Sequence, residues 1–293
     1  MFSQNEIFCV KPVSFGFSNA INDRVTADHQ SIYGKSVNTI TDQNQRQKLM
    51  SFLLNQSSYY LKKIKLEKVD TGGLHDVVFG DQPLGDFYFS DMISGLHDIK
   101  PSDTILDFGC STGRVIRNLH SAFDFEAYGC DPRSDSIQFN KEKFKDIEWF
   151  TSNEAPPIAD SHNTKYNLVF AISVWSHFSE EMAVAWFDEF YKLMKPNGKI
   201  IFTTHGTRSV FHFHSKLKRM DDEKAKQRLD VLRDGGFHYM PYPKGGDLDG
   251  DHWGMAYMSK QWVRDNLLDK WHLSEYLPGM AMENQDVYIL EKL

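Results

Sequence analysis

From residue 86 onward, short apolar segments alternate with longer amphipathic ones. The apolar segments predict strands at 104–108, 126–130, 147–151, 167–172 and 199–204, and the amphipathic ones predict helices near 86–98, 113–121 and 179–194. Segment 167–172 is apolar throughout, as expected of a central strand buried on both faces. Ser179 precedes Glu180 and Glu181, a favourable start for the third helix. The alternation predicts an α/β fold with a mainly parallel sheet between helices.

Residues 206–257 interrupt the alternation. They predict a helix near 215–233 and a loop rich in glycine, proline, tyrosine and histidine. An aromatic insertion of this length inside a compact domain suits a lid that covers a substrate. The alternation then resumes with a helix from Ser259 to Leu268 and strands near 271–277 and 285–291. Before the fifth strand, Lys195-Pro196-Asn197-Gly198 predicts a tight turn.

Residues 1–85 show no such alternation, and we interpret them as a largely helical N-terminal extension that contacts substrate or a second copy of the chain. Apolar positions spaced by three, four and seven within Thr41–Lys68 favour an amphipathic helix. The predicted organisation is therefore an extension, 1–85, and a main domain, 86–293, with 206–257 as its lid.

The composition and net charge restrict the classes of binding partner that we expect for this protein. The 33 Lys and Arg against 40 Asp and Glu give a net charge of −7, which disfavours nucleic acid. The N-terminus lacks the pattern of a signal peptide, and no segment is apolar for long enough to span a membrane, so we expect a cytoplasmic protein. Cys9, Cys110 and Cys130 are widely spaced and favour neither a disulfide framework nor a zinc site; we expect Cys110 and Cys130 to fill small apolar sites at strand ends.

The segment from Thr104 to Arg114 is the first candidate binding element. An apolar strand ends at Asp107 and Phe108 and leads into a loop with glycine at 109 and 113, followed by a helix N-terminus. Glycines let a backbone turn tightly and approach a ligand. A nicotinamide-binding fold would normally show Gly-x-Gly-x-x-Gly here, whereas this chain has Gly-x-x-x-Gly.

A second acid, Asp131, follows the second strand in Gly129-Cys130-Asp131-Pro132. A carboxylate at this position can accept hydrogen bonds from both hydroxyls of a ribose. The same residues also suit the start of a helix. Because nicotinamide enzymes place an acid similarly, Asp131 predicts a nucleoside site without choosing its cofactor.

The Asp107 loop resembles motif I of the class I S-adenosylmethionine-dependent methyltransferases, Asp-x-Gly-x-Gly-x-Gly, with Ser111 in place of the middle glycine. Segments 152–157, 171–178 and 193–199 are similar to the family's later motifs in order and spacing. The resemblance implies a Rossmann-like seven-stranded sheet of order 3-2-1-4-5-7-6 with strand 7 antiparallel, and S-adenosylmethionine as cofactor. It assigns cofactor binding to Asp107, Gly109, Cys110, Ser111, Gly113, Arg114, Asp131, Pro132, Asn153, Glu154 and Ser173. Residues 284–290 also resemble the Gln-Asp strand of members from glycan and natural-product pathways.

Methylation of an oxygen requires removal of its proton, and histidine is suited to this at neutral pH. His177 and His205 follow the fourth and fifth strands, at the sheet edge where α/β folds bind ligands. We expect at least one to be catalytic; the alternative is that His177 packs at a helix start and His205 faces solvent. A metal site is a further hypothesis, because the insertion contains His212, His214, His238 and His252. His212 and His214 would lie on one face of a strand. No matching ligand spacing accompanies them, and we expect no metal.

We therefore expect a methyltransferase that acts on a hydroxyl of a small molecule or glycan. A homo-oligomer is compatible with the sequence. The alternatives are an NAD(P)-dependent oxidoreductase and a non-catalytic methyltransferase-like scaffold. The residues do not distinguish a sugar acceptor from a phenol, a carboxylate or an amine.

Overall fold

A computed structural model describes residues 83–159, 163–243, 253–282 and 284–293. The expected helix within Thr41–Lys68, Cys9, His252 and all of the predicted extension before residue 83 lie outside these residues. Within the described part of the chain, no helix combines the length and the apolar character needed to cross a membrane.

The strand order is β3-β2-β1-β4-β5-β9-β8, which confirms the expected seven-stranded topology. The last two strands are antiparallel to their neighbours, whereas the β1–β2, β2–β3 and β4–β5 pairs are parallel. A separate two-stranded sheet, β6–β7, accounts for the two extra strands relative to the prediction. The chain divides into two compact units between Ser152 and Asn153.

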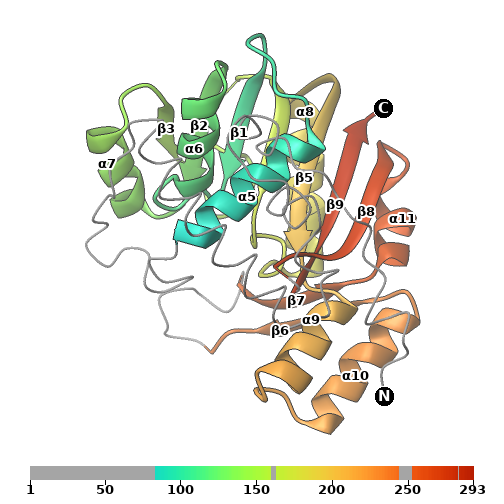
Figure 1. The fold of residues 1–293 in the computed structure, drawn as a ribbon. Coiled ribbons are helices and arrows are strands. Elements are labelled where there is room, and N and C mark those ends of the chain that lie inside the picture. Colours follow the sequence, from blue (N-terminus) through green and yellow to red (C-terminus); the bar gives the residue numbers. More distant parts are fainter. Residues whose placement is uncertain (1–82, 160–162, 244–252, 283) are drawn as a thin grey trace, which may run out of the picture. The chain divides into compact units, whose positions relative to one another are not determined.

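The described part of the unit that ends at Ser152, residues 83–152, holds three parallel strands and three helices, which Figure 1 shows in order along the chain. They are α5 (Pro83–Leu96), β1 (Thr104–Phe108), α6 (Arg114–Ala122), β2 (Glu126–Asp131), α7 (Ser134–Lys143) and β3 (Glu148–Thr151). Every residue of β1 is buried, as its apolar sequence predicts. Cys110 and Cys130 are free thiols and buried.

The unit that begins at Asn153 holds the other strands, and Figure 1 shows α9, α10 and the β6–β7 pair grouped at one end of β5. Its elements are β4 (Tyr166–Ala171), α8 (Glu180–Leu193), β5 (Met194–Thr204), α9 (Thr207–Phe211), the π-helix η3 (His212–Lys216), α10 (Asp222–Arg233), β6 (Phe237–Pro241), β7 (Gly254–Met258), α11 (Lys260–Leu267), β8 (Trp271–Ala281) and β9 (Gln285–Lys292).

Aromatic side chains fill the core of this unit. Trp175 stacks on Phe187 with ring centroids 4.7 Å apart, and Phe202 of β5 stacks on Tyr288 of β9 at 5.1 Å. Helix α8 begins where predicted, because the Ser179 hydroxyl accepts a hydrogen bond from the Met182 N–H at 3.2 Å. The cap and the aromatic face together fix α8 against the sheet.

Three predicted elements differ from the structure. The helix expected at 215–233 begins only at Asp222, because Lys218 has a left-handed φ of 55° and Asp221 caps the new helix. His212 and His214 lie in the π-helix that continues α9, and not on a strand. The turn expected at 195–198 is instead an irregular start of β5, with Asn197 at a φ of 59° and a register shift opposite Tyr166 and Leu168.

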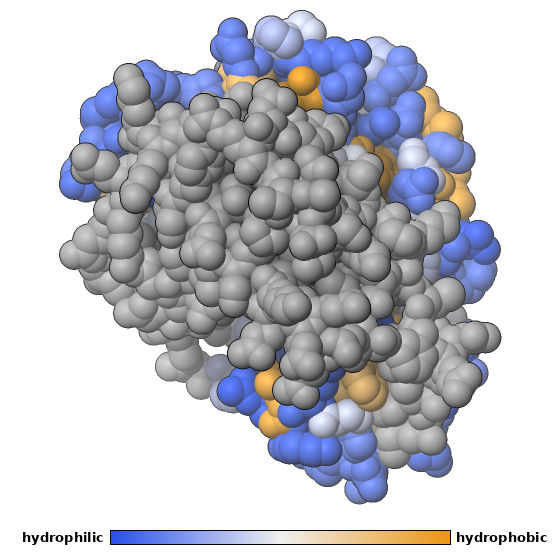
Figure 2. Space-filling model, in the orientation of Figure 1, coloured by the Kyte–Doolittle hydropathy of each residue, from blue (hydrophilic) through white to orange (hydrophobic). Residues whose placement is uncertain are grey.

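The described surface visible in Figure 2 is mainly hydrophilic, with small separate hydrophobic areas. Among the described residues, the large hydrophobic side chains that are exposed are Leu217, Met282 and Leu293. Scattered single residues of this kind are ordinary on a globular protein.

Candidate active site

The glycine loop after β1 turns through three left-handed residues. Gly109, Ser111 and Gly113 have φ angles of 76°, 47° and 70°. The N–H groups of Gly109 and Cys110 both donate to the Cys130 carbonyl at 2.9 Å, so the loop continues the pairing of β1 with β2. Gly113 directly precedes α6, whose first residue is Arg114. A turn of this kind leads the chain directly from β1 into the N-terminus of α6.

Asp131 holds this loop to the end of β2. Its Oδ2 accepts the Ser111 N–H at 2.9 Å, and its Oδ1 accepts the Arg133 N–H at 3.0 Å, across Pro132. Each carboxylate oxygen retains a lone pair, so the group can still accept hydrogen bonds from a ligand hydroxyl. Burial raises the pKa of Asp131, while the two amides lower it. Both sequence interpretations of Asp131, a ligand acceptor and a backbone cap, are compatible with this geometry.

Asp107 is buried below the loop, with 4% of its surface exposed. Burial raises the pKa of its carboxyl to about 8, although a hydrogen bond from the Ile116 N–H and the nearby Arg114 charge lower it. Ile116 is the third residue of α6, so Asp107 serves this helix as an N-terminal acceptor that Gly113 cannot provide. The structure thus places Asp107 in support of the loop.

Gly113 and Gly129 lie against the indole ring of Trp149. A Cβ atom at Gly113 would be 2.4 Å from Trp149 Cη2, and one at Gly129 would be 2.3 Å from its Cζ3. The ring is fixed by a hydrogen bond from its Nε1 to the Phe144 carbonyl at 2.8 Å. Both glycines are therefore required by packing, in addition to the backbone turn.

Replacing Gly113 with alanine should lower the free energy of unfolding by about 2–4 kcal/mol, from the left-handed φ and the contact with Trp149. Urea unfolding measures this change. Gly235 is a matched control, because its φ of 83° is similar but its Cβ would meet only the flexible Gln261 side chain at 3.0 Å. Gly235→Ala should cost about 1–2 kcal/mol from the strained φ alone; an equal loss in both variants would contradict the role of Trp149.

Asn153 and Glu154 follow β3 as expected, and both are exposed. The Asn153 amide donates to the Pro157 carbonyl at 2.9 Å, and its backbone N–H donates to the Ile158 carbonyl at 2.9 Å. Asn153 therefore closes a short loop.

A buried polar network joins the ends of β4, β5 and β9. Thr203 donates from Oγ1 to Gln285 Oε1 at 2.6 Å and accepts the Ser173 N–H at 2.7 Å. Because Oε1 is engaged by Thr203, the Gln285 Nε2 group faces Ser173 Oγ at 2.8 Å and His205 Nε2 at 3.3 Å. Ser173 adopts a φ of 62°, which this network maintains.

His205 is buried, with 3% of its surface exposed, and not solvent-facing. Its Nδ1 lies 3.1 Å from the Ala256 carbonyl, which can only accept, so Nδ1 carries the hydrogen. The opposite nitrogen then accepts from Gln285. Burial, with a smaller effect from His177, lowers the pKa of His205 to about 3. His205 is thus neutral, with both nitrogens engaged.

His177 differs from His205 in its partners. Its Nδ1 lies 3.0 Å from the Gly254 carbonyl and 2.8 Å from the Tyr242 hydroxyl. Its ring centroid is 6.4 Å from that of His205. Burial lowers the pKa of His177, while the Gly254 carbonyl raises it. The ring is neutral at pH 7, and both contacts fall on Nδ1.

His212, His214 and His238 are the insertion histidines of the metal hypothesis that the structure describes. Over the described residues, no group of three or more His, Cys, Asp or Glu side chains is arranged to hold a metal ion. His214 Nε2 instead lies 2.7 Å from an Asp222 carboxylate oxygen.

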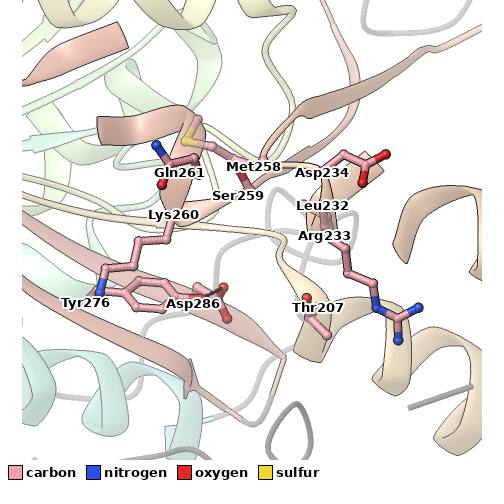
Figure 3. A pocket seen from close by; sticks show the side chains of 11 residues that line it. Thr207, Leu232, Arg233, Asp234, Met258, Ser259, Lys260, Gln261, Tyr276 and Asp286 are labelled. Atoms are coloured by element: carbon pink, nitrogen blue, oxygen red, sulfur yellow. Dashed lines mark hydrogen bonds between the residues drawn. The ribbon is translucent and has the colours of Figure 1, made fainter. Parts of the chain in front are cut away.

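A pocket of about 350 Å³ lies beside the start of β9 (Figure 3). Its lining includes Asp286, Tyr276 and Lys260, and the Lys260 ammonium lies 5.0 Å from the centre of the Tyr276 ring. Asp286 accepts hydrogen bonds from the Tyr276 hydroxyl and the Gly279 N–H, and burial raises its pKa to about 6. Successive side chains of a strand point to opposite faces, so Asp286 is directed away from the Gln285 network.

Sequence reasoning missed four residues of these sites: Trp149, Thr203, Tyr242 and Gly254. Gln285 enters the sequence prediction only as part of a strand. None of the four belongs to a local motif, and each acts through a contact with a residue distant in the sequence or on another strand. The sequence analysis interprets Gly113 only as part of a ligand-binding turn, and the contact of Gly113 and Gly129 with Trp149 is evident only in the structure.

Comparison of the sequence with family models and known proteins assigns this chain to a protein family. A family model described as a methyltransferase domain matches residues 86–250, which is more than half of the chain. Phosphoethanolamine N-methyltransferase 3 of Arabidopsis thaliana is 27% identical over 160 residues, covering 51% of this chain and 31% of its own length. Malonyl-[acyl-carrier protein] O-methyltransferase 1 of Ilyobacter polytropus is 26% identical over 141 residues, which cover 47% of this chain and 51% of the relative's own length.

The chain thus spans about a third to a half of the length of these curated relatives. Among solved structures, the PH0226 protein of Pyrococcus horikoshii superposes with a TM-score of 0.53 at 15% identity, covering 75% of this chain and 95% of the other. This likeness supports the fold.

Proposed function

Because this chain belongs to the class I S-adenosylmethionine-dependent methyltransferases, we propose that it transfers the methyl group to a hydroxyl oxygen of a small molecule or glycan. The cofactor supplies a methyl group already activated as a sulfonium. According to their names, one of the two relatives above methylates nitrogen and the other methylates oxygen. They therefore do not indicate which acceptor atom this chain uses. The choice rests on a histidine of this chain.

His177 is the observation that carries the proposal. A hydroxyl keeps its proton until it attacks, so its methylation gains from a general base, whereas an amine can lose its proton to solvent beforehand. With the hydrogen on Nδ1 directed to the Gly254 carbonyl, Nε2 presents a lone pair. His177 Nε2 would accept the proton of the acceptor hydroxyl as the new carbon–oxygen bond forms and the methyl carbon–sulfur bond breaks, which leaves S-adenosylhomocysteine.

His205 is less suited to this role. Its Nε2 lone pair is already directed at Gln285, and a conjugate acid with a pKa of about 3 corresponds to a weak base. We therefore assign the base to His177 and give His205 a supporting role, in which it links β5 to β7 through Ala256.

The residues around the glycine loop fit the cofactor's chemistry. We propose that Gly109, Cys110, Ser111, Gly113 and Arg114 border the cofactor, that Asp131 and Pro132 lie at its ribose, that Asn153 and Glu154 lie at its adenine, and that Ser173 supports its far end. The spare lone pairs of Asp131 support this assignment, because a buried carboxylate favours hydroxyl donors.

The acceptor atom can be tested with paired substrates. The full chain is incubated with S-adenosylmethionine that carries a deuterated methyl group and with hydroxyl compounds, each matched by its amine analogue. Mass spectrometry of the products locates the label. We expect label on oxygen, and its loss in His177→Gln. Label on nitrogen alone, or an unchanged O-methylation rate in His177→Gln, would overturn the proposal.

A further inference from the structure

Strand β7, which belongs to the insertion, is joined to both candidate histidines through its backbone. The Gly254 N–H donates to the His177 carbonyl at 2.8 Å, and the Met258 N–H donates to the His205 carbonyl at 2.8 Å. Between them, the Ala256 N–H donates to the Ser176 carbonyl at 2.8 Å. The insertion is therefore hydrogen-bonded to the segments that follow β4 and β5, and does not only cover them.

Gly254 permits this close approach. A Cβ atom at this position would lie 2.2 Å from the Met240 carbonyl oxygen and 2.6 Å from Tyr239 Cε2, so no larger residue fits without a shift of the backbone. Gly254 pairs with Pro241 in the β6–β7 ladder, and its own N–H and carbonyl both face His177. The carbonyl can only accept, and this places a hydrogen on His177 Nδ1.

Tyr242 directly follows β6 and completes the arrangement. Its backbone N–H donates to the Trp253 carbonyl at 3.0 Å, which fixes the residue to the base of β7. Its hydroxyl oxygen lies 2.8 Å from His177 Nδ1, within reach of the hydrogen that also points to Gly254. With two acceptors on one side of the ring, the tautomer that leaves Nε2 unprotonated is favoured.

We infer that Tyr242 is a positioning residue for His177, so that the insertion selects the tautomer and orientation of the base. This inference rests on the proposed function for its catalytic meaning, although the tautomer itself can be measured without any substrate. Among residues 83–159, 163–243, 253–282 and 284–293, which the structure describes, the titratable groups that face His177 are Tyr242 and His205, with ring centroids 6.0 Å and 6.4 Å away.

The test uses ¹⁵N NMR of the imidazoles in the full chain. His177 should show a protonated Nδ1 and an unprotonated Nε2. In Tyr242→Phe, the ring loses one acceptor for its hydrogen, so both the share of this tautomer and the pKa of His177 should fall. Tyr239→Phe makes the same chemical change on the adjacent strand β6 and should leave both unchanged. A merely structural role of Tyr242 would alter the melting temperature without moving the His177 signals.

Activity supplies the second readout. Tyr242→Phe should lower kcat about tenfold, roughly the value of one hydrogen bond, and move the acidic limb of the pH profile to lower pH. An unchanged tautomer, pKa and kcat in Tyr242→Phe would overturn the inference, while the proposed function would stand if His177→Gln still lost activity. If His177→Gln were fully active, the proposed function would fail, and the NMR result would still decide the role of Tyr242.

Discussion

Replacing His177 with glutamine should slow methyl transfer by about 10²–10⁴-fold, the usual contribution of a positioned general base. Glutamine is similar in size and can still donate to the Gly254 carbonyl, but it cannot take up a proton at neutral pH. Binding of S-adenosylhomocysteine should be nearly unchanged, because the residues assigned to the cofactor are different ones. Single-turnover kinetics with a methyl acceptor and calorimetry with S-adenosylhomocysteine measure the two effects separately.

The matched control for this variant is His205→Gln. His205 is buried and bonded to the Ala256 carbonyl and to Gln285, so its loss should reduce stability more than it reduces the rate per folded molecule. A larger rate loss at His205 than at His177 would show that the base has been assigned to the wrong histidine.

The second large effect is on stability and its dependence on pH. The carboxyl of Asp107 has a pKa of about 8 in the folded protein, mainly from burial, against 3.8 for an unperturbed aspartate. The folded state therefore holds this proton more tightly than the unfolded state, and stability falls as pH rises between these two values. The slope is about 1.4 kcal/mol per pH unit for one group and halves at the folded pKa, so the loss is roughly 2 kcal/mol between pH 6 and pH 8.

Asp107→Asn should remove this loss, because an amide does not titrate and its oxygen can still accept from Ile116. Urea unfolding of both proteins from pH 4 to pH 9 measures the difference. Asp286→Asn is the control: the pKa of Asp286 is about 6, so its influence ends near pH 6, below the upper part of the Asp107 window. A parallel pH dependence of wild type and Asp107→Asn between pH 6 and pH 8 would contradict the burial account.

The sheet could be predicted from the sequence because its signals are local. The apolar segments at 104–108 and 167–172 coincide within one residue with β1 and β4, and the order of the seven strands follows the family resemblance. The insertion was harder to predict. A left-handed Lys218 and the Asp221 cap end one helix and begin another, and neither residue type determines such a boundary on its own.

In the candidate site, too, local signals and long-range contacts differ in what the sequence reveals. Asp107, Gly109 and Gly113 lie within seven residues and Asp131 follows the next strand, so these positions together predict a nucleoside loop. The protonation of His177 depends on Gly254 and Tyr242, which lie 77 and 65 residues away in the sequence. Such contacts arise from the packing of β6 and β7, and the pattern of apolar and polar residues along the chain does not predict them.

Calorimetric titration of the full chain with S-adenosylhomocysteine, with NAD as the comparison, tests the central claim most directly. We expect one saturable site for S-adenosylhomocysteine in the range of about 1 μM to 1 mM, weakened at least tenfold by Asp131→Ala, and no binding of NAD at the same concentrations. Binding of NAD without binding of S-adenosylhomocysteine would contradict a methyl donor at the Asp107 loop.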